Sequence, residues 1–213
     1  TQWRHDRFWT LNGAAIATLF ELFMIWYYIH CGVAVVLYSR FEPFSVVHVL
    51  WLLFIPYWRD FHFYWIHRVM HKWNWKLFGL CDVGEYLYKH VHSLHHKSYN
   101  TGPWSGLSMH PVEHLIYYSC MLIPSIQPFC VVKQHPIHML FNKFHAHISP
   151  LPGHDGFDSP GGGSYFHYLH HAHFECNYGT PMVPFDKLFG SFEDGSKYRR
   201  MKKFDSVKEN KQQ

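Results

Sequence analysis

Long apolar runs alternate with polar, histidine-rich stretches along this chain. Residues 11–38 are apolar except for Asn12, Thr18, Glu21 and His30. A helix of about 20 residues crosses the ~30 Å hydrocarbon core of a bilayer, so this run predicts a membrane-spanning helix. Glu21 and His30 would then have to face protein rather than lipid. A buried helix of a soluble protein is the alternative interpretation.

A second apolar run, residues 44–58, is short for a full span. We predict that the helix continues past Pro56, with a kink there, into the sequence RDFHFYWIHRVMH. Such a helix leaves the membrane and places His67 and His71 just beyond it.

The rest of the pattern predicts shorter helices separated by loops. Residues 115–132 form a third apolar run, which Pro124 and Pro128 interrupt. Residues 135–148 predict a short fourth helix, and residues 164–176 predict another that carries histidines. The expected fold is therefore all-α. We expect an integral membrane helical bundle with two hairpin-like membrane segments and a cytosolic, histidine-rich helical cap that holds a dinuclear metal site.

Composition agrees with a molecule that is part membrane and part polar cap. Charged residues make up 16% of the chain, against about 25% in soluble domains, and apolar residues make up 48%. The mean hydropathy is nevertheless only -0.19, because 21 histidines lower it. Residues 1–213 fit a single domain, and the start at Thr1 rather than Met leaves an N-terminal truncation open.

Charge and cysteine usage narrow the setting further. The net charge of +4 is modest and does not indicate a nucleic-acid partner. Basic residues gather in a tail, residues 196–213, as is typical of the cytosolic side of a membrane, although a solvated tail is the alternative. The five cysteines include no CxxC pair, which argues against a disulfide framework or a zinc ribbon.

Three histidine clusters carry the candidate chemistry. Residues three and four apart share one face of a helix, so each cluster presents several imidazoles in one direction. The clusters are His67 and His71; His92, His95 and His96; and His167, His170 and His171. Structural zinc takes four ligands, usually with thiolates, whereas eight or nine neutral nitrogen donors suit two borderline ions such as iron. Asp60, Asp155 and Glu175 are candidates to offset the charge of the ions.

These clusters resemble the three histidine boxes of the fatty acid hydroxylase superfamily. They read HRVMH, HSLHH and HYLHH, and the flanking stretches DFHFYWIHRVMH and NYGTPMVPFDKLFGSFED are also similar to the family pattern. The resemblance covers roughly residues 55–195. Two further stretches, SGLSMHPVEH and GHDGF, resemble elements of the sterol desaturases within the superfamily.

The resemblance implies a specific set of site residues. His154, in GHDGF, becomes a ninth ligand candidate, with His147 as the runner-up. The implied metal ligands are His67, His71, His92, His95, His96, His154, His167, His170 and His171. Residues expected to support the ligands, or to replace one of them, are His90, His110, His147, His173, Asp60 and Asp155.

The resemblance also implies an activity. Members are membrane-bound di-iron oxygenases, so we expect an enzyme that hydroxylates or desaturates a lipid, a sterol foremost, with O2. Electrons would come from NAD(P)H through a b-type cytochrome or a similar carrier. The expected location is the endoplasmic reticulum with the histidine site facing the cytosol, or the plasma membrane if the source is bacterial. Two alternatives stay open: a fatty acyl or sphingolipid hydroxylase of the same superfamily, and a non-catalytic membrane metal-binding protein.

Overall fold

The computed structural model describes residues 1–31, 45–74, 76–126, 135–157 and 163–198. The end of the third apolar run, from residue 127, and the basic tail from residue 199 lie outside these ranges. Within them the chain is helical and has no strand, only one isolated bridge between Leu77 and Cys81. The all-α prediction is therefore confirmed for the described part of the chain.

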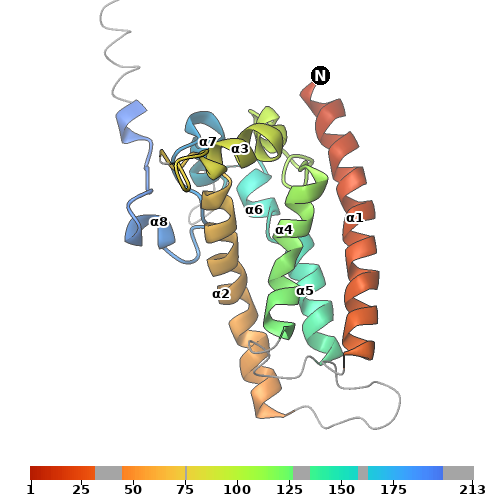
Figure 1. Ribbon diagram of the computed structural model, residues 1–213. Helices are drawn as coiled ribbons and strands as arrows, with labels where there is room; N and C mark the ends of the chain where they lie inside the picture. Colours follow the sequence, from red (N-terminus) through yellow and green to blue (C-terminus); the bar gives the residue numbers. More distant parts are fainter. Residues whose placement is uncertain (32–44, 75, 127–134, 158–162, 199–213) are drawn as a thin grey trace, which may run out of the picture.

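Four helices lie side by side as a bundle (Figure 1). They are α1 (Gln2–His30), α2 (Val46–Val69), α4 (Pro111–Leu122) and α5 (Pro136–Ile148). A cap of shorter elements covers the end of the bundle where α2 ends (Figure 1). The cap contains α3 (Val83–His90), the 3₁₀ helix η1 (His92–Lys97), α6 (Leu151–His154) and α7 (Ser164–His173). The 3₁₀ helix η2 (Ile123–Ser125) continues α4, and α8 (Phe185–Leu188) lies beside the cap end of α2.

The second apolar run and the first histidine box form one helix, as predicted. α2 runs through Pro56 without ending and carries His67 in its last turn. His71 follows shortly after the C-cap residue, Met70. α2 therefore connects the apolar bundle directly to the histidine cap, and the kink at Pro56 stays a prediction.

α4 is shorter than the apolar run that predicts it. Pro111 occupies its first turn, where the missing backbone N–H costs no hydrogen bond. α4 has 12 residues and ends at Leu122, before Pro124 in η2. At 1.5 Å per residue, this length is about 18 Å, less than the hydrocarbon thickness of a bilayer. α4 alone is therefore too short to span.

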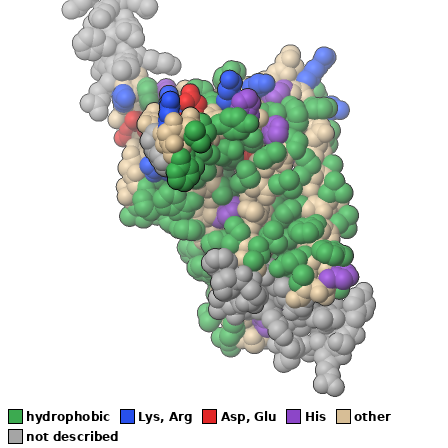
Figure 2. Space-filling view, in the orientation of Figure 1, with side chains coloured by type: hydrophobic (Ala, Val, Ile, Leu, Met, Phe, Trp, Pro, Cys, Tyr) green, Lys and Arg blue, Asp and Glu red, His purple; other side chains and the backbone are tan. Residues whose placement is uncertain are grey.

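α1 is the one described helix that is long and apolar enough to cross a membrane. Only 17% of its 18-residue apolar window is buried, so α1 is not enclosed in the manner of a core helix. Hydrophobic side chains cover most of the visible bundle surface, and charged side chains gather at the cap (Figure 2). This distribution agrees with an apolar bundle and a polar cap, while the second membrane segment and the cytosolic side of the cap stay predictions.

The buried core joins α1 to α4. Its members are Ala17, Phe20, Met24, Tyr28, Met109, Tyr117, Tyr118, Cys120, Met121 and Ala146. Gly13 permits the close approach of the two helices, since a Cβ atom there would lie 2.0 Å from Nε2 of His114. Tyr28 also donates a hydrogen bond of 3.1 Å to the carbonyl of Met121. One face of α1 is thus fixed to α4, and its other faces point outward.

Candidate metal centre

Two neighbouring groups of buried imidazoles occupy the cap. The five-histidine group consists of His67, His71, His92, His96 and His170, and the four-histidine group consists of His95, His154, His167 and His171. Within each group, one nitrogen of every ring lies within 4.8 Å of the others. The structure therefore brings together all nine histidines that the sequence nominates as ligands.

Two clusters divide between the groups. The second box forms the 3₁₀ helix η1, and not the α-helix assumed from the histidine spacing. His92 and His96 belong to the five-histidine group, whereas His95 joins the other. On α7, the adjacent His170 and His171 likewise belong to different groups. η1 and α7 thus hold the two groups side by side.

Hydrogen bonds fix two rings of the five-histidine group in one tautomer. Nδ1 of His67 donates to the carbonyl of Tyr178, and Nδ1 of His170 donates to the carbonyl of Cys176, each at 2.6 Å. Because a carbonyl only accepts, both rings carry hydrogen on Nδ1 and, when neutral, a lone pair on Nε2. These Nε2 atoms face the interior of the group.

The interior nitrogens are too close and too many for hydrogen bonds alone. Nε2 of His96 lies 3.0 Å from that of His92, 3.1 Å from that of His170 and 3.4 Å from that of His71. One nitrogen carries at most one hydrogen, so it cannot donate to all three neighbours. Nitrogens that bind one ion at about 2.1 Å lie roughly 3 Å apart when their bonds are perpendicular. The five-histidine group therefore fits a cation.

The four-histidine group has the same character. Nε2 of His167 and Nε2 of His171 are 3.1 Å apart. His95 donates through Nδ1 to the carbonyl of Ser108 at 3.2 Å, which leaves its Nε2 as an acceptor. Nδ1 of His154 lies 2.7 Å from Oγ of Ser105. This group also offers inward lone pairs that suit a cation.

Burial keeps these rings neutral. All nine histidines are at most 7% exposed, and desolvation is the largest cause that lowers the pKa of each below its ordinary value. Burial lowers the pKa of His95 from 6.5 to about 4. Repulsion between neighbouring rings acts in the same direction, for example between His71 and His67. Neutral imidazole is the form that binds metals.

Two carboxylates contact the five-histidine group from outside. Oε1 of the buried Glu113 lies 2.7 Å from Nδ1 of His92. Oε1 of Glu175 lies 3.7 Å from Nδ1 of His71, while its Oε2 accepts a hydrogen bond from Tyr178 at 2.9 Å. Glu175 is thus placed beside the group, as the sequence suggests. Glu113 was not singled out, although it is the acidic residue of the HPVE motif in the first turn of α4.

The two predicted aspartates have other partners. The carboxylate of Asp60 accepts a hydrogen bond of 2.9 Å from Thr180. Asp155 accepts one of 2.8 Å from the backbone N–H of Phe157. Neither aspartate belongs to the two histidine groups. Their negative charge could therefore affect bound ions only by long-range electrostatics.

Four further predicted histidines also lie outside both groups. His110 caps α4, since its Nδ1 accepts from the N–H of Val112. His147 bonds its own helix through the carbonyl of Lys143 at 2.8 Å. The remaining two contact aromatic rings: His90 faces Tyr86, and His173 stacks on Tyr198.

α1 reaches the four-histidine group through Asp6. This side chain is buried, and its Oδ1 accepts hydrogen bonds from Ser98 at 2.6 Å and from Ser108 at 3.2 Å. The carbonyl of the same Ser108 accepts from His95. Asp6 therefore connects α1 by hydrogen bonds to the loop that contains Ser108, which orients His95. The sequence pattern does not reveal this role.

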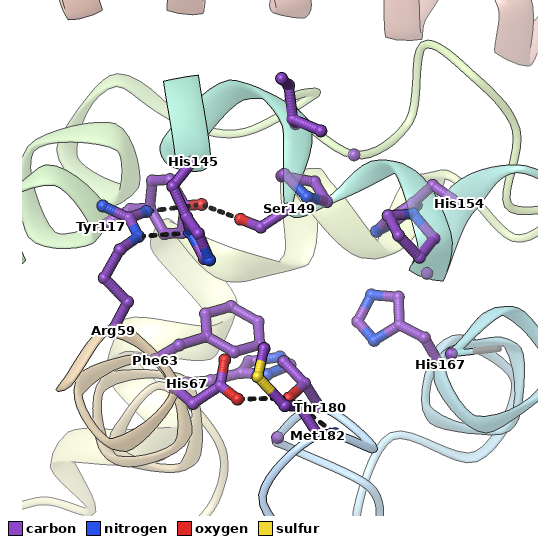
Figure 3. A pocket seen from close by; sticks show the side chains of 18 of the residues that line it. Arg59, Phe63, His67, Tyr117, His145, Ser149, His154, His167, Thr180 and Met182 are labelled. Atoms are coloured by element: carbon purple, nitrogen blue, oxygen red, sulfur yellow. Dashed lines mark hydrogen bonds between the residues drawn. The ribbon is translucent and has the colours of Figure 1, made fainter. Parts of the chain in front are cut away.

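A cavity of about 680 Å³ adjoins both groups. Its wall includes histidines of each group and many apolar side chains from α2, α5 and α7, among them Phe63, Phe141, Phe144, Ile148 and Phe166. In Figure 3, His154 and His167 lie on one side of this cavity, and Arg59, Tyr117 and His145 lie on the other. Ligand sites in proteins commonly have volumes of about 300–1,000 Å³. The cavity is therefore large enough for an extended apolar molecule beside the imidazoles.

Comparison with known proteins gives consistent relatives. A putative Delta(7)-sterol-C5(6)-desaturase from Arabidopsis thaliana is 30% identical over 138 residues, which cover 62% of this chain and 44% of the relative. A putative methylsterol monooxygenase from Dictyostelium discoideum is 29% identical over 142 residues, which cover 62% and 46%. A Delta(7)-sterol 5(6)-desaturase from Aspergillus fumigatus is 30% identical over 157 residues, which cover 71% and 42%.

The chain spans less than half the length of these curated relatives. No solved structure matches it significantly. The family model described as fatty acid hydroxylase matches residues 51–191, a stretch that makes up more than half of the chain and contains both histidine groups. The chain therefore belongs to the fatty acid hydroxylase family.

Proposed function

We propose that this chain is the catalytic part of a membrane-bound di-iron oxygenase that hydroxylates or desaturates a lipid, with a sterol as the favoured substrate. The observation that carries the proposal is the pair of neutral, buried histidine groups beside one apolar cavity. The relatives are named as sterol desaturases and a methylsterol monooxygenase, which favours a sterol over an acyl chain.

In this proposal each group holds one iron ion. The five-histidine group and the four-histidine group supply only neutral ligands, so the charge of the ions is offset from outside. Glu113 does so through His92, and Glu175 does so through His71. When bound, the ions supply the activation of O2 and the oxidation of an unactivated C–H bond. His90, His110, His147 and His173 stay candidates for supporting roles, as do Asp60 and Asp155.

The protein residues bind the lipid, orient it and exclude water. The cavity wall is mostly apolar and includes His67, His92 and His167, so a bound lipid lies against both groups. Removal of one hydrogen followed by oxygen transfer gives an alcohol, and removal of two gives an alkene. Which outcome occurs depends on how the wall positions the second hydrogen.

The membrane setting belongs to the same proposal. The exposed apolar faces of α1 and α2 would contact lipid, including Leu19, Leu22, Trp26, Leu50 and Leu53. The cap would face the cytosol of the endoplasmic reticulum, or the bacterial cytoplasm. There a b-type cytochrome or a similar carrier would deliver electrons from NAD(P)H.

A lipid comparison tests the activity. The chain, together with any missing N-terminal segment, is expressed in cells that lack their own sterol desaturases, and lipid extracts are compared by mass spectrometry. We expect one lipid class to become two hydrogen atoms lighter or one oxygen atom heavier. His95→Ala and His170→Ala should abolish the product, whereas His30→Ala, at the far end of α1, should not. Retained turnover in both site variants would refute the assigned ligands.

A further inference from the structure

The cavity contains a buried positive charge at a distance from the histidine groups. Arg59, on α2, is 4% exposed and lines the cavity wall. Among the described residues, no carboxylate forms an ion pair with it. The neighbouring Asp60 instead accepts from Thr180 on another part of the wall. A guanidinium in an apolar cavity is costly to bury unless its donors find acceptors.

The partners of Arg59 are all uncharged acceptors. Nε donates to Nδ1 of His145 at 3.0 Å, Nη1 donates to Sγ of Cys120 at 3.0 Å, and Nη2 donates to the hydroxyl of Tyr117 at 3.1 Å. The Tyr117 hydroxyl in turn donates to the carbonyl of Ala146 at 3.0 Å, which directs its lone pair toward Arg59. The guanidinium is therefore held in one position by acceptors on α4 and α5.

Among the described residues, two donors of this guanidinium have no hydrogen-bond acceptor. An arginine side chain has five N–H groups, and the three hydrogen bonds occupy only one on each nitrogen. The two remaining N–H groups belong to Nη1 and Nη2. Oxygen atoms are the acceptors that guanidinium N–H groups bind most strongly, above all when the oxygen is charged.

We infer that Arg59 binds the oxygen-bearing end of the lipid and thereby orients the molecule in the cavity. The inference rests on the proposed function for the identity of the cavity's occupant. The shared chemistry is an oxygen that accepts hydrogen bonds, either the hydroxyl of a sterol or the carboxylate of a fatty acid. Arg59 acts here as a specificity-determining residue and not as a catalytic one, since it lies across the cavity from His154 and His167 (Figure 3).

A binding experiment with paired probes tests this role. Purified protein in detergent is titrated with cholesterol and with cholestane, which lacks the hydroxyl, and then with oleic acid and with octadecene, which lacks the carboxylate. We expect the wild type to prefer the oxygenated member of one pair by roughly 10- to 100-fold, as a hydrogen bond to a charged group provides. The pair that shows the preference identifies whether a hydroxyl or a carboxylate is the natural partner.

Variants assign the preference to Arg59. Arg59→Met should reduce it to near unity while leaving the hydrocarbon affinities unchanged, and Arg59→Lys should keep part of it. Arg7→Met makes the same chemical change on the exposed surface of α1 and should keep the full preference. A wild type without preference, or an undiminished preference in Arg59→Met, would overturn the inference. If Arg59→Met does not fold, the affinity ratios of the wild type and of Arg59→Lys still test the role of Arg59.

The binding assay is independent of turnover. A protein that binds the oxygenated lipid through Arg59 but never oxidises it would contradict the proposed function and leave this inference intact. If the protein oxidises a lipid but Arg59→Met binds oxygenated and plain hydrocarbons with the wild-type preference, the proposed function stands and this inference fails.

Discussion

Nε2 of His96 lies 3.1 Å from Nε2 of His170, although 74 residues separate the two along the chain. His170 donates its only ring hydrogen to the carbonyl of Cys176, so its Nε2 offers a lone pair. Nitrogen atoms of the second and third histidine boxes therefore converge on a position where a cation would bind.

Glu113→Gln should weaken iron binding. The carboxyl group lies 2.7 Å from Nδ1 of His92 and is the one acidic side chain paired with that ring within the described residues. Loss of such an outer partner typically lowers metal affinity by roughly 10- to 100-fold. Iron retention during dialysis against a graded chelator measures the change. Glu85→Gln, on the exposed surface of α3, is the matched control, and equal retention in the two variants would contradict the role of Glu113.

The iron-free protein should lose stability in mild acid. The pKa of His95 is lowered from 6.5 to about 4 in the folded protein, so between these values the unfolded chain binds a proton that the folded chain does not. Stability is then full above pH 6.5 and falls as the pH drops toward 4, by about 3 kcal/mol from His95 alone. Thermal unfolding in detergent at pH 7.5, 6 and 5 measures this loss, and His95→Gln should reduce the slope. Constant unfolding temperatures over this range would count against the buried neutral ring.

Gly13→Ala should loosen the contact between α1 and α4. The added Cβ would lie 2.0 Å from Nε2 of His114, so the helices must separate or the ring must move. Overpacking of this kind costs about 1–3 kcal/mol. A double variant, Gly13→Ala with His114→Ala, should recover part of that loss because the obstructing ring is gone. Thermal unfolding measures both, and additive losses would show that the two residues do not meet.

Asp6→Ala should disturb the four-histidine group from a distance. It removes the acceptor that holds Ser98 and Ser108, and the carbonyl of Ser108 orients His95. We expect a lower unfolding temperature and a partial loss of iron. Thr10→Ala breaks another hydrogen bond between α1 and the cap loop, to the carbonyl of Trp104, and is the control. Iron content equal to that of the control would exclude the proposed link.

The local parts of this structure were predictable because short-range patterns determine them. The apolar run before His67 and the helix at residues 135–148 each depend on a few helical turns, and α2 and α5 confirm them. The expectation that each histidine cluster points in one direction is wrong for the second and third clusters, whose rings divide between the two groups. Eight of the nine grouped histidines lie in the three closely spaced clusters, and the ninth, His154, was expected only from the resemblance of GHDGF to the sterol desaturases.

The rest depends on contacts that spacing does not encode. The division of η1 and α7 between two histidine groups follows from how the elements meet in space. Arg59 carries no local pattern of its own, and only the packing of α2, α4 and α5 shows what surrounds it. Glu113 lies in the stretch SGLSMHPVEH, which does not reveal its contact with His92 of η1. The interruption at Pro124 agrees with the structure, since α4 ends at Leu122 and Pro124 lies in η2.

Iron analysis of the purified protein shows whether each histidine group binds an ion. We expect two iron ions per chain in the wild type. We expect about one in His170→Ala and about one in His171→Ala, because these adjacent residues of α7 belong to different groups. A wild type that holds no metal, or two ions in both variants, would show that the histidine groups are not the two iron sites.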